Sequence, residues 1–502
     1  MDIFSCMLSG FQVSLQPINI IYCFLGVCYG TLIGVLPGIG PVGAMSLLLP
    51  ATFRMAPASA IIMLSGIYYG CMYGGSTTSI LVNIPGEAAS VVTCLDGYQM
   101  ALKGRAGPAL GIAAFGSFIG GTLSIIGLML VANPLVSFAL NFGPAEYFAL
   151  MCLGLTILVY LARGSMIKAF IMAAFGLILA AVGMDVISGK PRFYFGRAEL
   201  LDGIDLVPLV MGLFGISEIF SNIETTLKRD ILLKGKIANL LPTLKDWKDS
   251  FWSILRGTLI GFGLGILPGG GALISSFVSY GVEKRVSKHP EAFGQGAIEG
   301  VAGPETANNA ATGGAFIPLF GLGIPSNVVM ALLLGALLIH GIKPGPLLLT
   351  QHPEIFWGTI TSMYVGNIML LFLNLPLIGI WVKVLKVPFR FLFPLILLFC
   401  LIGSYSVNQR PFDVVLMAGF GIVGYLLRKL DYEPAPLVLA FVLGPLLENA
   451  LRQSLILSDG SFAIFISRPI SAIALGICLF LIVSAISPRL RKTKKKLEVD
   501  LG

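Results

Sequence analysis

Long apolar runs separated by short polar segments recur along the whole chain. Residues 108–132, 355–384 and 462–486 each hold the ~20 mostly apolar residues that a helix needs to cross a bilayer. By that length criterion we expect roughly 10 to 13 transmembrane segments, because short segments broken by glycine or proline can enter the membrane without crossing it. The pattern predicts an all-α, multi-pass membrane protein.

Composition supports this class and argues against others. Charged residues make up 12% of the 502 residues, about half the share that is usual in soluble domains, and the mean hydropathy is +0.90. The chain has no nucleotide-binding, metalloprotease or serine-hydrolase motif, so we expect no enzyme activity and no cofactor. Its eight cysteines form no C-x-x-C pair and its three histidines are far apart, so no metal site is predicted. The net charge of +8 fits loops that flank a membrane, and we expect no nucleic-acid partner.

One unusual string occurs twice. Residues 30–40 read G-T-L-I-G-V-L-P-G-I-G, and residues 261–271 read G-F-G-L-G-I-L-P-G-G-G. Further matches follow in the same order: Gly74-Gly75 with Gly313-Gly314, Ile84-Pro85-Gly86 with Ile324-Pro325-Ser326, and Pro208-Leu209-Val210 with Pro436-Leu437-Val438. A duplicated sequence with glycine and proline breaks at matching points is typical of a transporter, whose binding site lies at the breaks.

These features divide the chain into an N-terminal segment (1–17), a first transmembrane repeat (18–225), a basic linker (226–249), a second repeat (250–450), a C-terminal transmembrane helix (451–487) and a basic tail (488–502). The basic linker and tail are expected in the cytoplasm. Residues 449–461 carry only Arg452 and Asp459 and are expected outside. The repeats would then be inverted, although parallel repeats stay possible because the charge of a single loop is weak evidence.

The two L-P-G-x-G strings should interrupt helices. Proline removes a backbone donor, glycine permits positive φ, and in a membrane such a break is tolerated only where it faces protein or a water-filled cavity. The freed backbone groups can bind an ion or a charged substrate. The alternative is a kink for packing. The candidate substrate- or ion-binding residues are Pro37, Gly38, Gly40, Pro268, Gly269, Gly270 and Gly271.

Two polar segments lie between apolar runs. In each, a short polar stretch followed by a turn suggests a re-entrant hairpin whose tip lies inside the protein, while the alternatives are hydroxyl contacts between helices for the first segment and a solvated helix N-terminus for the second. The candidates in the first segment are Ser76, Thr77, Thr78, Ser79, Asn83, Pro85 and Gly86. Those in the second are Glu305, Thr306, Asn308, Asn309, Thr312, Gly313, Gly314, Pro325, Ser326 and Asn327. Glu305 is the best candidate for an ion-coupling carboxylate, since acids inside a membrane are costly. Glu87 and Asp96 are interpreted as solvated or interfacial.

Four stretches carry a family resemblance: 30–50 (G-T-L-I-G-V-L-P-G-I-G-P-V-G-A-M-S-L-L-L-P), 67–87 (I-Y-Y-G-C-M-Y-G-G-S-T-T-S-I-L-V-N-I-P-G-E), 304–318 (P-E-T-A-N-N-A-A-T-G-G-A-F-I-P) and 321–327 (G-L-G-I-P-S-N). They resemble the large membrane subunit of tripartite tricarboxylate transporters, the TctA family. Where the pattern leads us to expect I-P-G, this chain has Ile324-Pro325-Ser326, and serine adopts positive φ less freely than glycine.

The resemblance implies a secondary transporter of the bacterial inner membrane that imports citrate or another carboxylate. Its expected partners are a small membrane subunit, a periplasmic solute-binding protein, the carboxylate substrate and membrane lipid. Na⁺ or H⁺ is the expected coupling ion. The alternatives are a passive carboxylate channel and a different ion-coupled organic anion transporter.

Overall fold

The computed structural model describes residues 3–36, 38–162, 165–185, 187–224, 240–269, 271–385, 387 and 389–486. Outside these residues lie most of the basic linker, the whole basic tail, Pro37 and Gly270. Within the described residues the chain is helical apart from one antiparallel pair of short strands, β1 (Gly183–Met184) and β2 (Pro191–Arg192). The prediction of an all-α protein is therefore confirmed.

The first half contains α1 (Ile3–Ser14), α2 (Pro17–Val35), α3 (Gly40–Leu48), η1 (Leu49–Arg54), α4 (Pro57–Val82), η2 (Ala88–Ser90), α5 (Val91–Leu102), α6 (Ala106–Ala139), α7 (Pro144–Leu161), α8 (Met166–Ala180), η3 (Ala198–Leu200), α9 (Leu206–Val210), η4 (Met211–Ile216) and α10 (Ser217–Glu224). The second half contains α11 (Leu244–Ile266), α12 (Gly271–Val286), η5 (Pro290–Ala292), α13 (Glu299–Leu322), α14 (Val328–Ile339), α15 (Leu348–Gln351), α16 (Pro353–Asn374), α17 (Ile378–Val384), α18 (Phe389–Asn408), α19 (Pro411–Lys429), α20 (Ala435–Leu457), α21 (Ile464–Ser467) and α22 (Pro469–Ile486).

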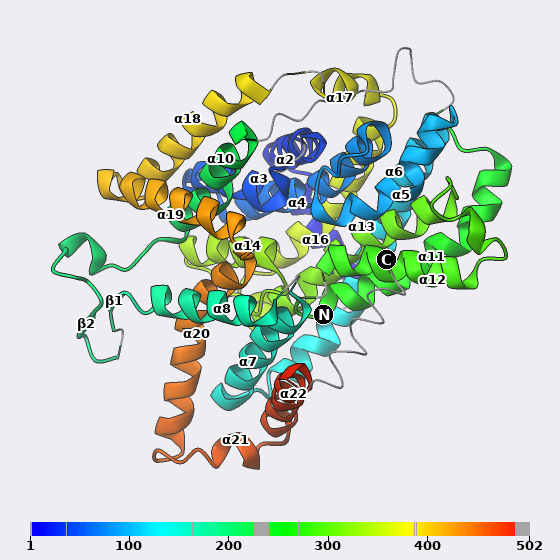
Figure 1. The fold of residues 1–502 in the computed structure, drawn as a ribbon. Coiled ribbons are helices and arrows are strands. Elements are labelled where there is room, and N and C mark those ends of the chain that lie inside the picture. Colours follow the sequence, from blue (N-terminus) through cyan, green and yellow to red (C-terminus); the bar gives the residue numbers. More distant parts are fainter. Residues whose placement is uncertain are drawn as a thin grey trace.

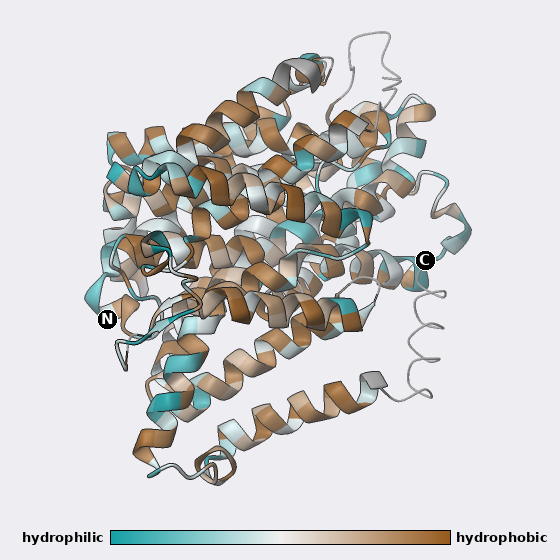
Figure 2. Ribbon diagram, turned by 60° about the vertical axis from the view of Figure 1, so that its left-hand side comes forward, coloured by the Kyte–Doolittle hydropathy of each residue, from teal (hydrophilic) through white to brown (hydrophobic). Residues whose placement is uncertain are grey.

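Six helices in the described part of the chain are long and apolar enough to cross a membrane: α2, α6, α7, α16, α19 and α20. Five shorter apolar stretches, in α8, α9 to α10, α14, α18 and α22, fall below the length of a full span. The expected 10 to 13 crossings thus exceed the six that meet this criterion. Figure 2 shows hydrophobic residues along most helices and hydrophilic residues in several loops and helix ends.

Both repeated strings interrupt helices, as predicted. The first break separates α2 from α3, and Gly38 and Gly40 there have φ of 105° and 63°. The second break separates α11 from α12, and Gly269 and Gly271 have φ of 76° and 46°. Residues with a Cβ rarely adopt this left-handed region, so glycine is required at these four positions.

The glycines that precede each break serve a different purpose. A Cβ built on Gly30 would lie 2.5 Å from the carbonyl oxygen of Ile67, and one on Gly261 would lie 2.2 Å from that of Ala307. Gly30 therefore lets α2 approach α4, and Gly261 lets α11 approach α13, as small residues do at helix contacts in membranes. Each string thus combines a helix contact with a helix break.

The two polar segments are helical over most of their length. Ser76–Ser79 lie inside the 26-residue helix α4, and residues 303–314 lie inside α13. Hydroxyls inside these helices find partners without interrupting the helix, since Ser79 donates to Gly75 O at 3.0 Å and Thr306 donates to Ala302 O at 2.7 Å. Only the residues after each helix turn: we call residues 84–86 the first turn and residues 324–326 the second turn.

The two halves of the chain pack across each other. Helix α6 of the first half lies against α11 and α13, whereas α16 of the second half lies against α2 and α4. In the same way α8 packs on α20, and α19 packs on η4. Figure 1 shows α2, α3 and α4 near the middle of the molecule, with α18 and α19 toward one side and α7, α20 and α22 toward another.

Candidate functional site

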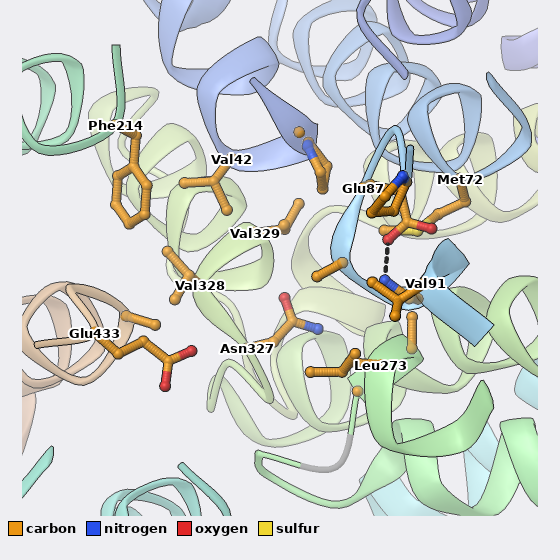
Figure 3. Close-up of a pocket in the computed structure, with 18 of the residues that line it drawn as sticks. Val42, Met72, Glu87, Val91, Phe214, Leu273, Asn327, Val328, Val329 and Glu433 are labelled. Carbon is orange, nitrogen blue, oxygen red and sulfur yellow. Dashed lines mark hydrogen bonds between the residues drawn. The ribbon is translucent and has the colours of Figure 1, made fainter. Parts of the chain in front are cut away.

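A cavity of about 570 Å³ is lined by the two breaks, by the first turn and by the residues that follow the second turn. We call it the central cavity. The breaks contribute Gly38, Gly40, Gly269 and Gly271 to its lining, and the turns with the residues that follow them contribute Pro85, Gly86, Glu87 and Asn327. Figure 3 shows Glu87 and Asn327 on separate elements around this space. Segments more than 180 positions apart in the sequence therefore form one wall.

Each turn is fixed to the break in its own half of the chain. The backbone N–H of Gly269 in the second break donates to Ser326 O in the second turn at 2.8 Å. In the first half, a Cβ on Gly86 would lie 2.0 Å from Gly34 O, so only glycine allows the first turn to lie against the end of α2. The two halves thus attach the turn to the break by different contacts.

The structure also corrects the reason for glycine at the turns. Neither Gly86 nor Ser326 is among the residues with positive φ, so the serine of the second turn is not strained. The left-handed residues are instead Asn83, with φ of 58° at the end of α4, and Gly323, with φ of 70° at the end of α13. Glycine is needed at position 86 so that the first turn can lie close to the end of α2. Ser326 shows that the corresponding position of the second turn accepts a side chain.

Glu87 is a buried residue of the central cavity, so its interpretation as a solvated or interfacial residue is wrong. Its side chain is 6% exposed. Its Oε2 accepts the Ala89 N–H at 2.5 Å, and its Oε1 accepts from Asn308 Nδ2 at 3.2 Å. The contact with Asn308 joins the first repeat to α13 of the second.

Asp96 is buried as well, but it has a structural role. Its Oδ1 accepts the backbone N–H groups of Gly294, Gly296 and Ala297 at 2.9, 2.7 and 2.8 Å, and its Oδ2 accepts from Tyr280 Oη at 2.8 Å. These bonds fix the loop before α13 to α5. Glu87 and Asp96 precede Lys103 and Arg105 in an amphipathic stretch, and this charge pattern is typical of a solvated or interfacial segment.

Glu305 lies in the protein interior and is 1% exposed, and it is not among the residues that line the central cavity. Its Oε2 accepts from Ser76 Oγ at 2.6 Å, and its Oε1 accepts from Thr93 Oγ1. It is therefore not a solvated helix N-terminus. Its carboxylate joins α13 to α4 and α5 through two hydroxyl donors.

Most of the other predicted residues lie in helix contacts away from the cavity. Thr78 Oγ1 donates to Val35 O at 2.7 Å and so supports the end of α2. Asn309 Nδ2 donates to Ser117 Oγ at 2.7 Å, which joins α13 to α6. Thr77 borders a small void between α4, α6 and α16, and Thr312 borders another beside Asn309. Gly313 and Gly314 allow close approach of α6 and α11. Pro268 lies beside Gly154 of α7, and Pro325 is buried in the second turn.

A further wall of the central cavity was not predicted from the sequence. It is formed by Phe214 of η4, Glu218 of α10, Arg428 of α19 and Glu433 before α20. Figure 3 shows Phe214 and Glu433 on this side. No local pattern in the sequence marks these four residues as part of a site.

Comparisons with known proteins agree with the resemblance. The model of the family "Tripartite tricarboxylate transporter TctA family" matches residues 20–439. An Agrobacterium vitis protein described as an uncharacterized 52.8 kDa protein in the TAR-I ttuC' 3'region is 51% identical over 500 residues, covering 100% of this chain and 99% of the relative. A second, described as an uncharacterized protein in the TAR-II ttuC' 3'region of the same species, is 53% identical over 237 residues, or 47% of this chain and 98% of the relative.

No solved structure matches the chain. The family match covers most of the chain and includes both breaks, both turns and the cavity residues that they contribute. The chain therefore belongs to the tripartite tricarboxylate transporter TctA family, and it is a multi-pass protein of the inner membrane and not an enzyme.

Proposed function

We propose that the chain is the large membrane subunit of a binding-protein-dependent secondary transporter that imports a tricarboxylate or another carboxylate, driven by a Na⁺ or H⁺ gradient. The observation that carries the proposal is the central cavity, which is lined by both helix breaks, by the first turn and by the residues that follow the second turn. A site formed by broken helices at matching points of two repeats is typical of secondary transporters.

The breaks suit an anionic substrate. Helices α3 and α12 begin at Gly40 and Gly271, and both glycines line the central cavity. The first N–H groups of a helix lack partners within the helix and carry partial positive charge, so they can bind a carboxylate. Two such helix starts at one cavity support a substrate with more than one carboxylate.

The buried acids support coupling to a cation. Glu87 lines the cavity and Glu305 lies in the protein interior, and the hydrogen-bond donors to both carboxylates are hydroxyl or amide groups. Bringing an anionic substrate next to a buried carboxylate is unfavourable unless a positive charge enters with it. Entry of that charge down its gradient would drive uptake.

We further propose that the two repeats are inverted and that α4 with α5, and α13 with α14, form re-entrant hairpins around the two turns. The crossed packing of α6 on α11 and α13, and of α16 on α2 and α4, supports a two-fold relation between the repeats. The charge pattern of the linker and of residues 449–461 favours the inverted arrangement over the parallel one.

The proposed partners are a small membrane subunit and a periplasmic solute-binding protein. Two partners are proposed because the family name describes a tripartite transporter. Lipid would surround the outer helices, where large apolar side chains are exposed, such as Phe170 at 62% and Phe480 at 67%. The substrate would pass from the binding protein to the central cavity.

The test is uptake of labelled carboxylates by liposomes that contain this chain and the small subunit, with loaded binding protein outside. We expect accumulation above the external concentration, only with an imposed Na⁺ or H⁺ gradient. Equilibration without accumulation, by this chain alone and with the gradient collapsed, would favour a passive channel. Absence of any carboxylate flux in the complete system would contradict both.

A further inference from the structure

The charges around the central cavity are unbalanced. Among the described residues that line it, the acids are Glu87, Glu218 and Glu433, and the one basic residue is Arg428. A carboxylate that enters this space meets more negative than positive side chains. The guanidinium of Arg428 is therefore the side chain best suited to bind it, because arginine can present two parallel N–H donors to a carboxylate.

In the structure Arg428 is paired with Glu218. Its Nη1 forms an ion pair with Glu218 Oε2, joining the end of α19 to the first turn of α10. The Arg428 side chain is 29% exposed and that of Glu218 is 10% exposed, so the pair is at the cavity's edge and its arginine is accessible. Glu218 presents to Arg428 the same chemical group that a carboxylate substrate would.

The local backbone of this wall is unusual. Glu218 follows a π-helical stretch, Met211–Ile216, and Phe214 within that stretch also lines the cavity. Single π-helical turns are rare and occur frequently at functional sites. This observation is independent of the ion pair and points to the same wall.

Packing holds this wall together without the ion pair. A Cβ on Gly212 would lie 2.5 Å from Met417 O, and one on Gly424 would lie 3.0 Å from Leu213 Cα, so the backbones of η4 and α19 are in close contact. The rings of Phe220 and Tyr425 pack edge to face at 5.8 Å. Loss of the Arg428–Glu218 pair should therefore leave the helices in place.

We propose that Arg428 binds a carboxylate group of the transported substrate, and that Glu218 occupies the guanidinium while the cavity is empty. This inference rests on the proposed function and adds the side chain that recognises the substrate's charge. Substrate binding exchanges one carboxylate partner of Arg428 for another, so the guanidinium is never left unpaired in the protein interior. Glu218 then acts as a competitor of the substrate.

The proposal predicts opposite effects for the two members of the pair. The measurement is exchange of labelled for unlabelled acetate, succinate or citrate across liposomes that contain the complete transporter, with the internal concentration varied. Arg428→Gln should raise the half-saturating concentration about 10- to 100-fold, the effect of losing a charge-assisted hydrogen bond. Glu218→Gln should lower it about 2- to 5-fold, since the competing ion pair is partly exposed. Arg428→Lys should fall between wild type and Arg428→Gln.

The matched control is the ion pair at the other end of α19, where Arg410 Nη2 lies 2.7 Å from Asp202 Oδ2. Neither residue lines the central cavity, so Arg410→Gln should leave the half-saturating concentration unchanged. An unchanged value for Arg428→Gln, or a rise in both Arg428→Gln and Glu218→Gln, would overturn the proposal. Failure of the wild-type protein to exchange any of the three carboxylates would instead contradict the proposed function.

Discussion

The backbone N–H of Gly269 donates a 2.8 Å hydrogen bond to the carbonyl oxygen of Ser326, which joins the second helix break to the second turn. Both residues belong to the second half of the chain, but they are separated by the whole of α12 and α13. A change in the backbone of the break would therefore move the turn, and with it Asn327 in the lining of the central cavity.

Replacement of the break glycines should abolish transport. Gly269 has φ of 76°, and a Cβ there would lie 2.9 Å from Leu158 Cα, so Gly269→Leu is both strained and blocked. Gly38→Leu is strained by its φ of 105° and places a side chain at the cavity. We expect both variants to insert into the membrane with uptake below detection. Wild-type uptake by both would mean that the breaks are packing kinks.

A smaller side chain should be enough to impair transport when it is introduced at the first turn. Gly86→Ala would place a Cβ 2.0 Å from Gly34 O, which forces the turn and the adjacent Glu87 away from the end of α2. We expect a loss of about 1–3 kcal/mol in stability, as for overpacking elsewhere, together with impaired uptake. Thermal unfolding and uptake are the measurements.

The control for this variant is Gly379→Ala. Gly379 lies in α17 and has open space around its Cβ position, so alanine should be neutral or slightly stabilising there. Equal melting temperatures and uptake for the Gly86→Ala and Gly379→Ala proteins would show that the first turn does not need its close approach to α2.

The helix breaks could be predicted from the sequence because proline and glycine determine local backbone conformation directly. Matching breaks in two repeats also gave the expectation that distant segments meet, and Gly38 and Gly269 do line one cavity. The helical state of Ser76–Ser79 could not be predicted in this way. Their composition suggests a polar segment, but their hydroxyls have partners in the packed structure, such as Glu305 for Ser76 and Val35 O for Thr78.

The acidic and basic residues of the cavity were harder to identify. Glu87 lies in an amphipathic stretch near Lys103 and Arg105, which resembles a membrane surface, and only the three-dimensional contact with Asn308 shows that it is buried. Arg428 lies at the end of an apolar run, where a basic residue usually marks a membrane boundary. Its position in the cavity lining depends on how α19 packs against η4, which no local pattern encodes.

Glu305→Gln should uncouple transport from the driving ion. The amide keeps the shape of the side chain that Ser76 and Thr93 contact, but it can neither ionise nor bind a proton or Na⁺ as a carboxylate does. We expect exchange of carboxylate between the two sides of a liposome to continue while accumulation driven by a gradient falls at least 10-fold. Glu354→Gln, at a half-exposed residue in the first turn of α16, is the control. Normal accumulation by the Glu305→Gln protein would exclude a coupling role.

The topology can be tested with reporter fusions. Fusions at Lys236 and Lys495, which lie outside the described residues, should report the cytoplasm, because the segments around them are basic. A fusion at Ser458, directly after α20, should report the periplasm. A cytoplasmic signal at Ser458 would contradict the inverted arrangement of the repeats and would leave the parallel one.

Asp185 should stabilise the β1–β2 hairpin in a manner that depends on pH. Arg452 donates to its two carboxylate oxygens at 3.0 and 2.8 Å, and the N–H groups of Ser188 and Ile187 donate to Oδ1 at 3.0 and 2.8 Å. The bonds from Arg452, and then those from the backbone, hold the pKa of Asp185 well below its ordinary value. A carboxyl group whose pKa is lowered by folding stabilises the protein above its unfolded pKa, about 3.9, and loses that contribution as the pH falls further.

Asp185→Asn should therefore lower the melting temperature of the purified protein by a constant amount between pH 8 and about pH 5, and by less below about pH 4. The two melting curves should approach each other in acid because the carboxyl group of the unfolded chain takes up a proton below about pH 3.9, while the folded carboxylate, bound by Arg452, stays ionised. Asp459→Asn, beyond the end of α20, is the control and should change the melting temperature little at any pH. A difference between wild type and Asp185→Asn that grows as the pH falls would contradict the stabilising role of the carboxylate.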